Sequence, residues 1–377
     1  MKPIRAKFED ILRLCMWYID YILFLFSLQK KEIKTRINNI LLIELLYIGD
    51  LIVITPTLRA LRNKFKDSKI TLMTLTEMKD VLSGNKNIDK ITSYKLEYLK
   101  NNPDKIINEL NNKYDLAIIL HPHPELGSKI SKIIYKANIP YRIGCTKVGI
   151  RESKGSLLTQ KTRPTFKLKH KIDDNLDVIK TLGITTANKN LELYTTRESD
   201  KKIKDKLKIS KDKLIIVIHS KPNHKTHEWF QERFAELSDN LIKEYKATII
   251  FTGSNKDNDY INNIIKLMKY KAFNFSGDSI KEFFSIIKNS DIIISTDTSA
   301  MHIAAAFNKP VISLFGAGNP EIWHPYCNNH IEIYKNEVCT SCMKHECFRK
   351  NERYMECMKS IIAKDVLDAV NKIQKVI

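Results

Sequence analysis

The sequence predicts an α/β protein with two doubly wound domains, each built on a parallel sheet. Short runs rich in Ile, Val and Leu alternate with helix-like segments through both halves, as in repeated strand–helix units. Two of these units also place a polar turn directly after a strand, where open α/β sheets bind ligands. With 377 residues, 43% of them hydrophobic, the chain is large enough for two domains with cores of ordinary size.

In the first half, strand and helix patterns alternate from residue 39 onward. The expected strands are residues 39–48, 69–75 and 114–120, and the expected helices are residues 51–65 and 171–182. Between them, residues 121–128, rich in His and Pro, are expected to form a loop that leads into a helix. Polar connectors at residues 185–190 and 195–208 then predict a domain boundary near residues 190–210.

In the second half, the same alternation continues. Strands are expected at residues 214–219, 247–253, 292–294 and 311–315, with helices at residues 230–244, from Lys256 and from Ser279. The longest motif spans residues 295–316. Its turn contains Asp297, Thr298 and Ser299, which offer capping side chains and free backbone N–H groups at a helix start. Such a start binds phosphate oxygens, so this motif predicts a nucleotide-sugar site.

A second motif, early in the chain, has the same order of strand, glycine turn and helix. It contains Gly49, Asp50, Thr55 and Pro56. Because Asp50 follows a strand, its carboxylate is expected at the carboxyl end of a sheet, a suitable place for a general base. The alternative is that Asp50 only caps the helix.

With both motifs in this order, the chain resembles glycosyltransferase family 9, the heptosyltransferase family of lipopolysaccharide core synthesis. The matching residues are Gly49, Asp50, Thr55 and Pro56, then Asp297, Thr298, His302, Ala304, Ala305, Ala306, Pro310, Leu314, Phe315 and Gly316. Weaker matches extend the resemblance over roughly residues 38–368. The resemblance implies the GT-B fold, two Rossmann-like domains facing across a cleft. It assigns acceptor binding to residues 38–195 and donor binding to residues 205–377.

The resemblance also suggests roles for particular residues. Asp50 matches the general base that takes a proton from the acceptor hydroxyl. The donor-binding candidates are Ser220, Lys225, Thr252, Gly253, Thr296, Asp297, Thr298, Ser299 and His302, and the acceptor-binding candidates are Gly49, Thr55, His121 and His123.

Some of these residues have ordinary structural alternatives. His302 suits a buried structural role as well as a ligand contact, and Thr252 and Gly253 suit a simple turn.

The chain departs from the family pattern at two positions. Ser299 stands where family members usually carry glycine, which narrows the allowed backbone angles of the turn. His227 takes the place of a lysine two residues before Trp229, and Lys225 lies two residues earlier. We assign the charge-neutralising role at the diphosphate to Lys225.

The formal net charge is +20, from 63 basic and 43 acidic residues. The lysines are scattered, and no arginine-rich arm, zinc finger or aromatic RNA-binding signature is present, which argues against a nucleic-acid partner. Residues 11–28 are apolar except for Arg13, Asp20 and Ser27, which fall on one stripe of a helix. This segment and the basic linker up to residue 37 fit a helix in the membrane interface or one docked on the protein. Either way, we expect a cytoplasmic protein, peripheral on the inner face of the cytoplasmic membrane.

Four of the seven cysteines, Cys339, Cys342, Cys347 and Cys357, lie close together near the end of the sequence. Their spacing permits a zinc site but is irregular, so reduced thiols or a local disulfide remain alternatives. We expect no required cofactor and no catalytic metal, because no Asp-x-Asp stands in a suitable loop.

Together these features predict an inverting, metal-independent glycosyltransferase. The most suitable substrates are ADP-heptose as donor and a lipopolysaccharide-core or other lipid-linked saccharide as acceptor. The alternatives are another hexosyltransferase, an epimerase-like enzyme on the same fold, or an inert membrane-surface binding protein.

Overall fold

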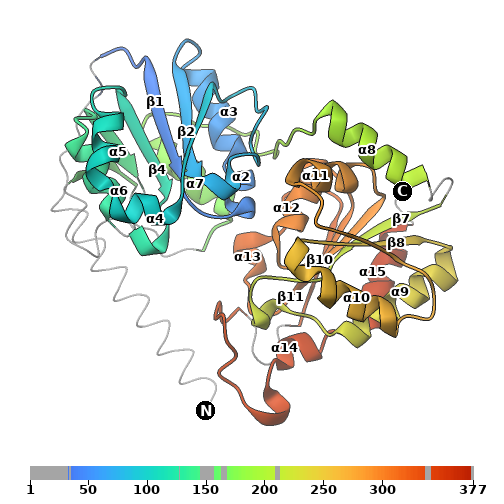
Figure 1. Ribbon diagram of the computed structural model, residues 1–377. Helices are drawn as coiled ribbons and strands as arrows, with labels where there is room; N and C mark the ends of the chain where they lie inside the picture. Colours follow the sequence, from blue (N-terminus) through green and yellow to red (C-terminus); the bar gives the residue numbers. More distant parts are fainter. Residues whose placement is uncertain are drawn as a thin grey trace. The chain divides into compact units, whose positions relative to one another are not determined.

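The computed structural model describes residues 33, 35–126, 128–144, 157–162, 168–208, 213–335 and 341–374. The chain divides into two compact units between Lys189 and Asn190. Each unit contains a six-stranded parallel sheet (Figure 1). The apolar segment at residues 11–28 lies outside the described residues. Within the described ranges, no helix is both long enough and apolar enough to cross a membrane.

The first unit has the strand order β3-β2-β1-β4-β5-β6. Its strands are β1 (Asn39–Glu44), β2 (Lys69–Leu75), β3 (Lys90–Tyr94), β4 (Leu116–His121), β5 (Tyr141–Gly144) and β6 (Gln160–Lys161). Its helices are α2 (Ile48–Val53), α3 (Thr55–Lys64), α4 (Leu96–Asn101), α5 (Pro103–Leu110), α6 (Lys129–Lys136) and α7 (Lys171–Lys180). One face of the sheet packs against α4, α5 and α6, through residues such as Leu41, Ile106 and Ile133.

The second unit has the strand order β12-β11-β10-β7-β8-β9. This is the topology of the first unit with the strands counted from the opposite edge of the sheet. Its strands are β7 (Ile215–His219), β8 (Thr248–Gly253), β9 (Phe273–Ser276), β10 (Ile292–Thr296), β11 (Val311–Phe315) and β12 (His330–Tyr334). Its helices are α8 (Arg197–Leu207), α9 (Gln231–Tyr245), α10 (Asn258–Leu267), α11 (Ile280–Lys288), α12 (Ser299–Ala306), α13 (Pro320–Trp323), α14 (Glu356–Lys359) and α15 (Ala363–Gln374).

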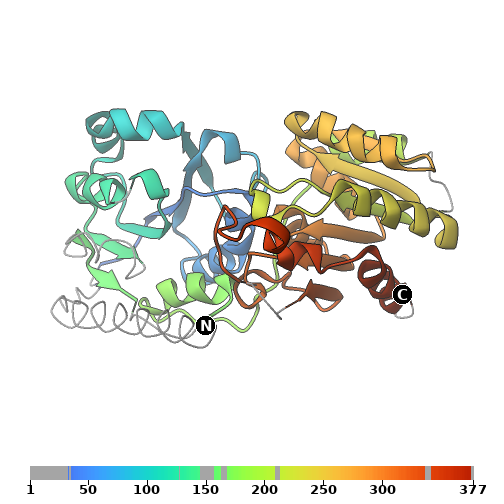
Figure 2. The ribbon, with the colours of Figure 1, turned by 90° about the horizontal axis from the view of Figure 1, so that it is seen from below.

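Both sheets are buried because helices cover them on two sides (Figures 1 and 2). In the second unit, α9, α10 and α15 share one apolar core with the sheet, including Phe234, Ile261 and Val370. Central strands such as β1 and β10 are therefore almost continuously apolar, as expected for parallel strands buried on both faces. The sequence prediction of two doubly wound α/β domains is confirmed, and each sheet has the strand order of a Rossmann fold.

Several expected elements differ from the structure. The strand expected at residues 39–48 ends at Glu44, and the helix expected at residues 51–65 is two helices, α2 and α3. The polar connector expected at residues 195–208 is wrong, because this segment contains helix α8. Its basic side chains pair with the acidic residues of the segment around α11, where Lys202 contacts Glu282 and Lys206 contacts Asp278.

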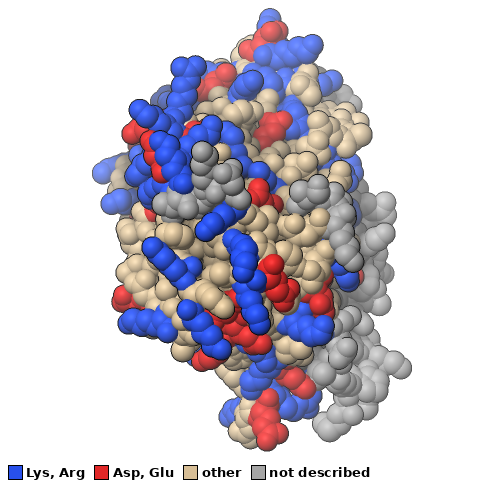
Figure 3. Space-filling view, turned by 90° about the vertical axis from the view of Figure 1, so that its right-hand side faces the viewer, with Lys and Arg blue, Asp and Glu red and all other residues tan. Residues whose placement is uncertain are grey.

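On the face shown in Figure 3, the charged side chains do not form a single basic surface. Lys and Arg are interspersed there with Asp and Glu, and uncharged surface lies between them. This mixed face lacks the concentrated basic stripe that marks a nucleic-acid-binding domain.

Candidate active site

In the first unit, the site residues lie at the carboxyl ends of β1 and β4. The chain runs outward from β1 to β2 and β3, and then returns to β4 on the other side of β1. Ligands of doubly wound sheets bind at this reversal of strand order. Glu44 is the last residue of β1, His121 is the last residue of β4, and Asp50 lies in the first turn of helix α2.

Glu44 and His121 form a buried pair. Glu44 is fully buried, and its Oε2 lies 2.6 Å from Nδ1 of His121, whose side chain is 15% exposed. The other oxygen, Glu44 Oε1, has no hydrogen-bond partner among the described residues. Burial raises the pKa of Glu44 well above its usual range, and the positive charge of Lys171 opposes this rise. Glu44 was not among the residues expected from the sequence.

Asp50 caps its helix and has a raised pKa. Its Oδ2 accepts a hydrogen bond from the Tyr47 N–H at 3.3 Å, so part of the capping alternative is correct. Burial, followed by the charge of Glu44, raises the pKa of Asp50 to about 6, whereas His121 and Lys171 act to lower it. A carboxyl with this pKa is ionised at neutral pH and is still a better proton acceptor than an ordinary aspartate.

The other acceptor-binding candidates, Gly49, Thr55 and His123, differ in their burial and in their contacts. Gly49 precedes Asp50 in α2. Thr55 is buried at the start of α3, and its hydroxyl donates to the Ile52 carbonyl at 2.8 Å, which joins the two helices. His123 is buried in the loop after β4, and its Nδ1 accepts the Glu125 N–H at 3.3 Å. His123 also contacts the exposed ring of Tyr47 edge-on, with the ring centroids 6.4 Å apart.

In the second unit, the corresponding reversal lies between β7 and β10. Ser220 follows β7, and Thr296 is the last residue of β10. Both hydroxyl oxygens are buried and have no hydrogen-bond partner among the described residues. Both hydroxyls lie at the strand ends where doubly wound sheets bind their ligands.

The turn after β10 starts helix α12 in the way that the sequence predicts. Thr298 is the N-cap, and its hydroxyl oxygen accepts the Ala300 N–H at 3.3 Å. The Ser295 hydroxyl lies 2.8 Å from the same oxygen. Ser299 is the first residue of the helix, so its position does not need the left-handed backbone that favours glycine. The departure from glycine therefore leaves the helix start intact.

Asp297 is held next to His227. Oδ2 of Asp297 lies 3.2 Å from Nδ1 of His227, and both side chains are mostly buried. A Cβ at Gly318 would lie 1.8 Å from Asp297 Oδ2, so a larger residue there would force this carboxylate to move. Lys225, by contrast, is exposed. The sequence identified His227 only as a departure from the family pattern, and its contact with Asp297 was missed.

The remaining donor-binding candidates surround the same edge of the second sheet. Thr252 is the residue before the last in β8, and its hydroxyl lies 3.1 Å from Nδ1 of His219. Burial lowers the pKa of His219 to about 4. Gly253 is the last residue of β8, where a Cβ would lie 2.9 Å from that of Asp257. His302 is 2% exposed within α12, and its ring centroid lies 6.0 Å from that of Trp323.

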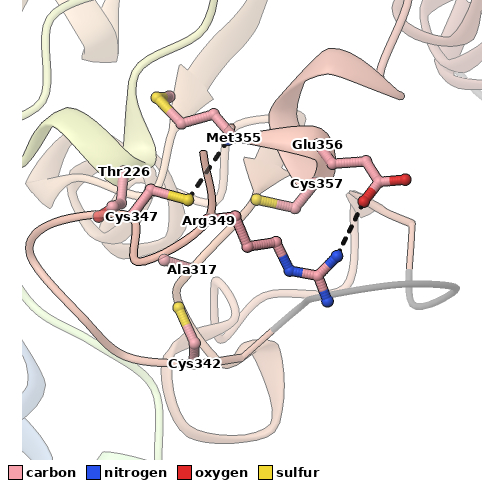
Figure 4. Close-up of a pocket in the computed structure, with 8 residues that line it drawn as sticks. All are labelled: Thr226, Ala317, Cys342, Cys347, Arg349, Met355, Glu356 and Cys357. Atoms are coloured by element: carbon pink, nitrogen blue, oxygen red, sulfur yellow. Dashed lines mark hydrogen bonds and ion pairs between the residues drawn. The ribbon is translucent and has the colours of Figure 1, made fainter. Parts of the chain in front are cut away.

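The described cysteines of the tail surround a small cavity in the second unit. Cys342, Cys347 and Cys357 turn their sulfur atoms toward a common space that Thr226 and Ala317 also line (Figure 4). All three are free thiols. Cys339 lies outside the described residues, and no group of three or more potential metal ligands is found within them.

Comparisons with known proteins agree with this architecture. Residues 104–352 match the sequence profile of "Glycosyltransferase family 9 (heptosyltransferase)". The chain is 24% identical to lipopolysaccharide heptosyltransferase 3 of Escherichia coli strain K12 over 339 residues, covering 87% of this chain and 95% of that protein.

Solved structures show the same fold. A family 9 glycosyltransferase from Veillonella parvula superposes with a TM-score of 0.75 at 21% identity, covering 89% of this chain and 97% of the other. The ADP-heptose lipopolysaccharide heptosyltransferase II of E. coli gives a TM-score of 0.70 at 18% identity, covering 89% and 98%.

The two Rossmann-like units give the chain the GT-B fold that these solved glycosyltransferases share. The match over most of the chain makes the assignment specific. The chain belongs to glycosyltransferase family 9.

Proposed function

We propose that this enzyme transfers heptose from ADP-heptose onto a lipopolysaccharide-core saccharide, with inversion at the anomeric carbon. The observation that carries the proposal is the half-buried carboxyl of Asp50, with a pKa of about 6, at the ligand-binding edge of the first sheet. The heptosyltransferases to which the chain is similar support the choice of sugar. Family membership favours this reaction over an epimerase-like activity or an inert binding protein.

In the proposed reaction, Asp50 accepts the proton of the acceptor hydroxyl as its oxygen attacks the anomeric carbon. The new carbon–oxygen bond forms while the bond to the diphosphate breaks, and ADP leaves with the bonding electron pair. A single displacement of this kind inverts the configuration. General-base assistance of this type contributes about 10²- to 10⁴-fold in rate.

We assign acceptor binding to the first domain, residues 38–195, through Gly49, Thr55, His121 and His123. The buried pair of Glu44 with His121 supports a polar site at this edge. The acceptor is a lipid-linked saccharide, so the enzyme works as a peripheral protein at the cytoplasmic face of the inner membrane. The membrane association predicted from the sequence for residues 1–37 is consistent with this location.

We assign donor binding to the second domain, residues 205–377. The donor contacts are Ser220, Lys225, Thr252, Gly253, Thr296, Asp297, Thr298, Ser299 and His302, to which the structure adds His227. The unpaired buried hydroxyls of Ser220 and Thr296 support this assignment. Backbone N–H groups at the start of α12 bind the diphosphate and stabilise the charge that develops on it, so no metal ion is needed.

Release of ADP from ADP-heptose tests the proposal. Purified enzyme should release ADP only when a truncated lipopolysaccharide acceptor is present, and other nucleotide sugars should give little release. Release of ADP without acceptor would point to hydrolysis or another reaction. Acceptor-dependent turnover of a different nucleotide sugar would retain the transferase and replace the donor.

A further inference from the structure

The loop that carries His227 has few buried residues of its own. Between β7 and α9, residues 221–227 bury only Pro222 and Thr226. A turn gives the segment its local shape, with the His227 N–H donating to the His224 carbonyl at 3.0 Å. Segments with so few buried contacts open easily, so the position of His227 depends on what holds this loop from outside.

The tail segment at residues 341–345 crosses two loops at the carboxyl edge of the second sheet. The Met343 N–H donates to the Ala317 carbonyl at 2.8 Å, in the loop after β11. The Lys344 carbonyl accepts the Thr226 hydroxyl at 2.6 Å, in the loop after β7. Thr226 and Ala317 also line the same small cavity (Figure 4). The tail segment therefore joins the β7 loop to the β11 loop.

Both of these loops approach Asp297, in the turn after β10. The β7 loop does so through His227, whose Nδ1 lies 3.2 Å from Asp297 Oδ2. The β11 loop does so at Gly318, where there is no room for a Cβ beside the same oxygen. The tail segment thus holds together the two loops that face the Asp297 carboxylate at the proposed donor site.

His345 adds an aromatic contact between the tail segment and the β7 loop. Its ring stacks on that of His224, with the ring centroids 3.7 Å apart and an interplanar angle of 11°. The His224 ring in turn lies edge-on to that of His227, with the centroids 5.9 Å apart. The three rings form a row that ends at Asp297. Because aromatic pairs contribute more than the area they bury, this row fixes the β7 loop against the tail.

We propose that the tail completes the donor site, with His345 as a positioning residue that holds His227 against Asp297 through its stack on His224. The inference rests on the proposed donor-binding role of this site. His345 does not touch the donor in this scheme. Without the stack the β7 loop would leave its place more often, so the donor would bind less tightly, whereas acceptor binding in the first unit would not change.

The test is the ADP affinity of His345→Ala, measured by calorimetry on the full chain, together with the KM values of both substrates. ADP affinity should fall by about two- to tenfold, as expected for the loss of one aromatic pair. KM for ADP-heptose should rise by a similar factor. The kcat value and KM for the acceptor should stay within about twofold, because only donor binding is weakened.

Two further substitutions separate the ring from the rest of the side chain. His345→Phe retains a ring that can stack, and it should bind ADP as the wild type does. His345→Gln has no ring, so it should lose affinity as His345→Ala does, and it replaces that variant if alanine prevents folding. Phe348→Ala is the control, because it removes a side chain that is 46% exposed from a neighbouring position of the tail. Its ADP affinity should match that of the wild type.

A double-mutant cycle tests whether His345 acts through His224. His224→Ala should weaken ADP binding at least as much as His345→Ala does. In the His224→Ala background, His345→Ala should cause no further loss, because the stack is already broken. Losses that simply add would overturn the proposal, and so would an His345→Phe variant that binds ADP as weakly as His345→Ala.

The outcome is separable from that of the proposed function. If ADP does not bind the wild-type enzyme, the assignment of the donor fails whatever His345 does. If ADP binds the wild type and His345→Ala equally well, only the positioning role of the tail fails.

Discussion

The two units are alike at the amino ends of their strands and different at the carboxyl ends. In the first unit, Asp115 precedes β4, and its Oδ2 accepts the Asn39 N–H at 2.8 Å, at the start of β1. In the second unit, Asp291 precedes β10, and its Oδ2 accepts the Ile215 N–H at 2.8 Å, at the start of β7. An aspartate at the equivalent position in each unit therefore joins the starts of the two central strands of its sheet.

At the opposite edge, the two sheets carry different chemistry. The first has three ionisable groups, the buried Glu44 and the half-buried His121 and Asp50, of which both acids have raised pKa values. The second has buried hydroxyls and a His–Asp contact around the start of a helix. On one shared scaffold, the proposed roles are proton transfer in the first unit and anion binding in the second. The roles can differ because function resides in the side chains at the strand ends.

The largest effect on this division of roles between the two units is expected from the replacement of Asp50. Asp50→Asn removes the proton acceptor, so kcat should fall by about 10³-fold. ADP affinity, measured by calorimetry, should stay within about twofold, because the second unit is unchanged. A variant that loses ADP binding together with transfer would show that the two units do not divide the work in this way.

The next largest effect is expected at the donor site. His227→Ala removes a side chain in contact with Asp297, and ADP-heptose affinity should fall by about tenfold or more, the usual loss for a hydrogen bond to a charged group. Lys225→Ala should have a smaller effect, because that side chain is exposed. Lys266→Ala, on α10, removes a charge elsewhere on the same unit and is the control. A larger loss for Lys225→Ala would restore it as the main charged contact.

A smaller effect is expected on the pH dependence of kcat/KM, which should reflect Asp50 in the first unit. The wild-type kcat/KM should rise with pH through about 6, because Asp50 must lose its proton to act as a base. Lys171→Met removes a positive charge that favours ionised Asp50, so this limb should move up by on the order of half a pH unit. ADP binding should show no such shift. A limb that moves down would contradict the charge arrangement around Asp50.

The smallest effect is expected on removal of metal ions. Activity after treatment with a chelator should match untreated enzyme, because backbone N–H groups at the α12 start and His227 are proposed to neutralise the diphosphate. Restoration of lost activity by added Mg²⁺ or Mn²⁺ would show that the second unit depends on a metal. Mass spectrometry of the untreated protein measures how much metal it carries before the chelator is added.

The sequence predicted those parts of the fold whose local pattern agrees with their burial. Strand β2 occupies residues 69–75 as expected, because six of its seven residues are buried and apolar or hydroxyl-bearing. Helix α8 was missed because most of its eleven residues are polar or charged, and only Ser199, Ile203 and Leu207 are buried. The segment is so polar overall that it could not be distinguished from a polar connector.

The sites show the same limit. Asp50 and the turn at Asp297 could be predicted, since each follows a strand within one motif. Glu44 sits inside an apolar run, and its pairing depends on a bulge that the sequence does not reveal. Its contact with His121 spans 77 residues. Contacts of this range depend on the register of strands that lie far apart in the sequence.

The contacts of the tail carry a consequence for biosynthesis. Met358 packs where a Cβ on Gly316 would lie 2.4 Å from its sulfur, the Thr226 hydroxyl donates to the Lys344 carbonyl at 2.6 Å, and the Trp229 indole N–H donates to the Ile361 carbonyl at 3.0 Å. The loop that carries His227 is thus secured by residues translated more than a hundred codons later. Because domains fold largely in the order in which they leave the ribosome, we expect the proposed base to be in place early in synthesis and the proposed donor site to be complete only after the tail emerges.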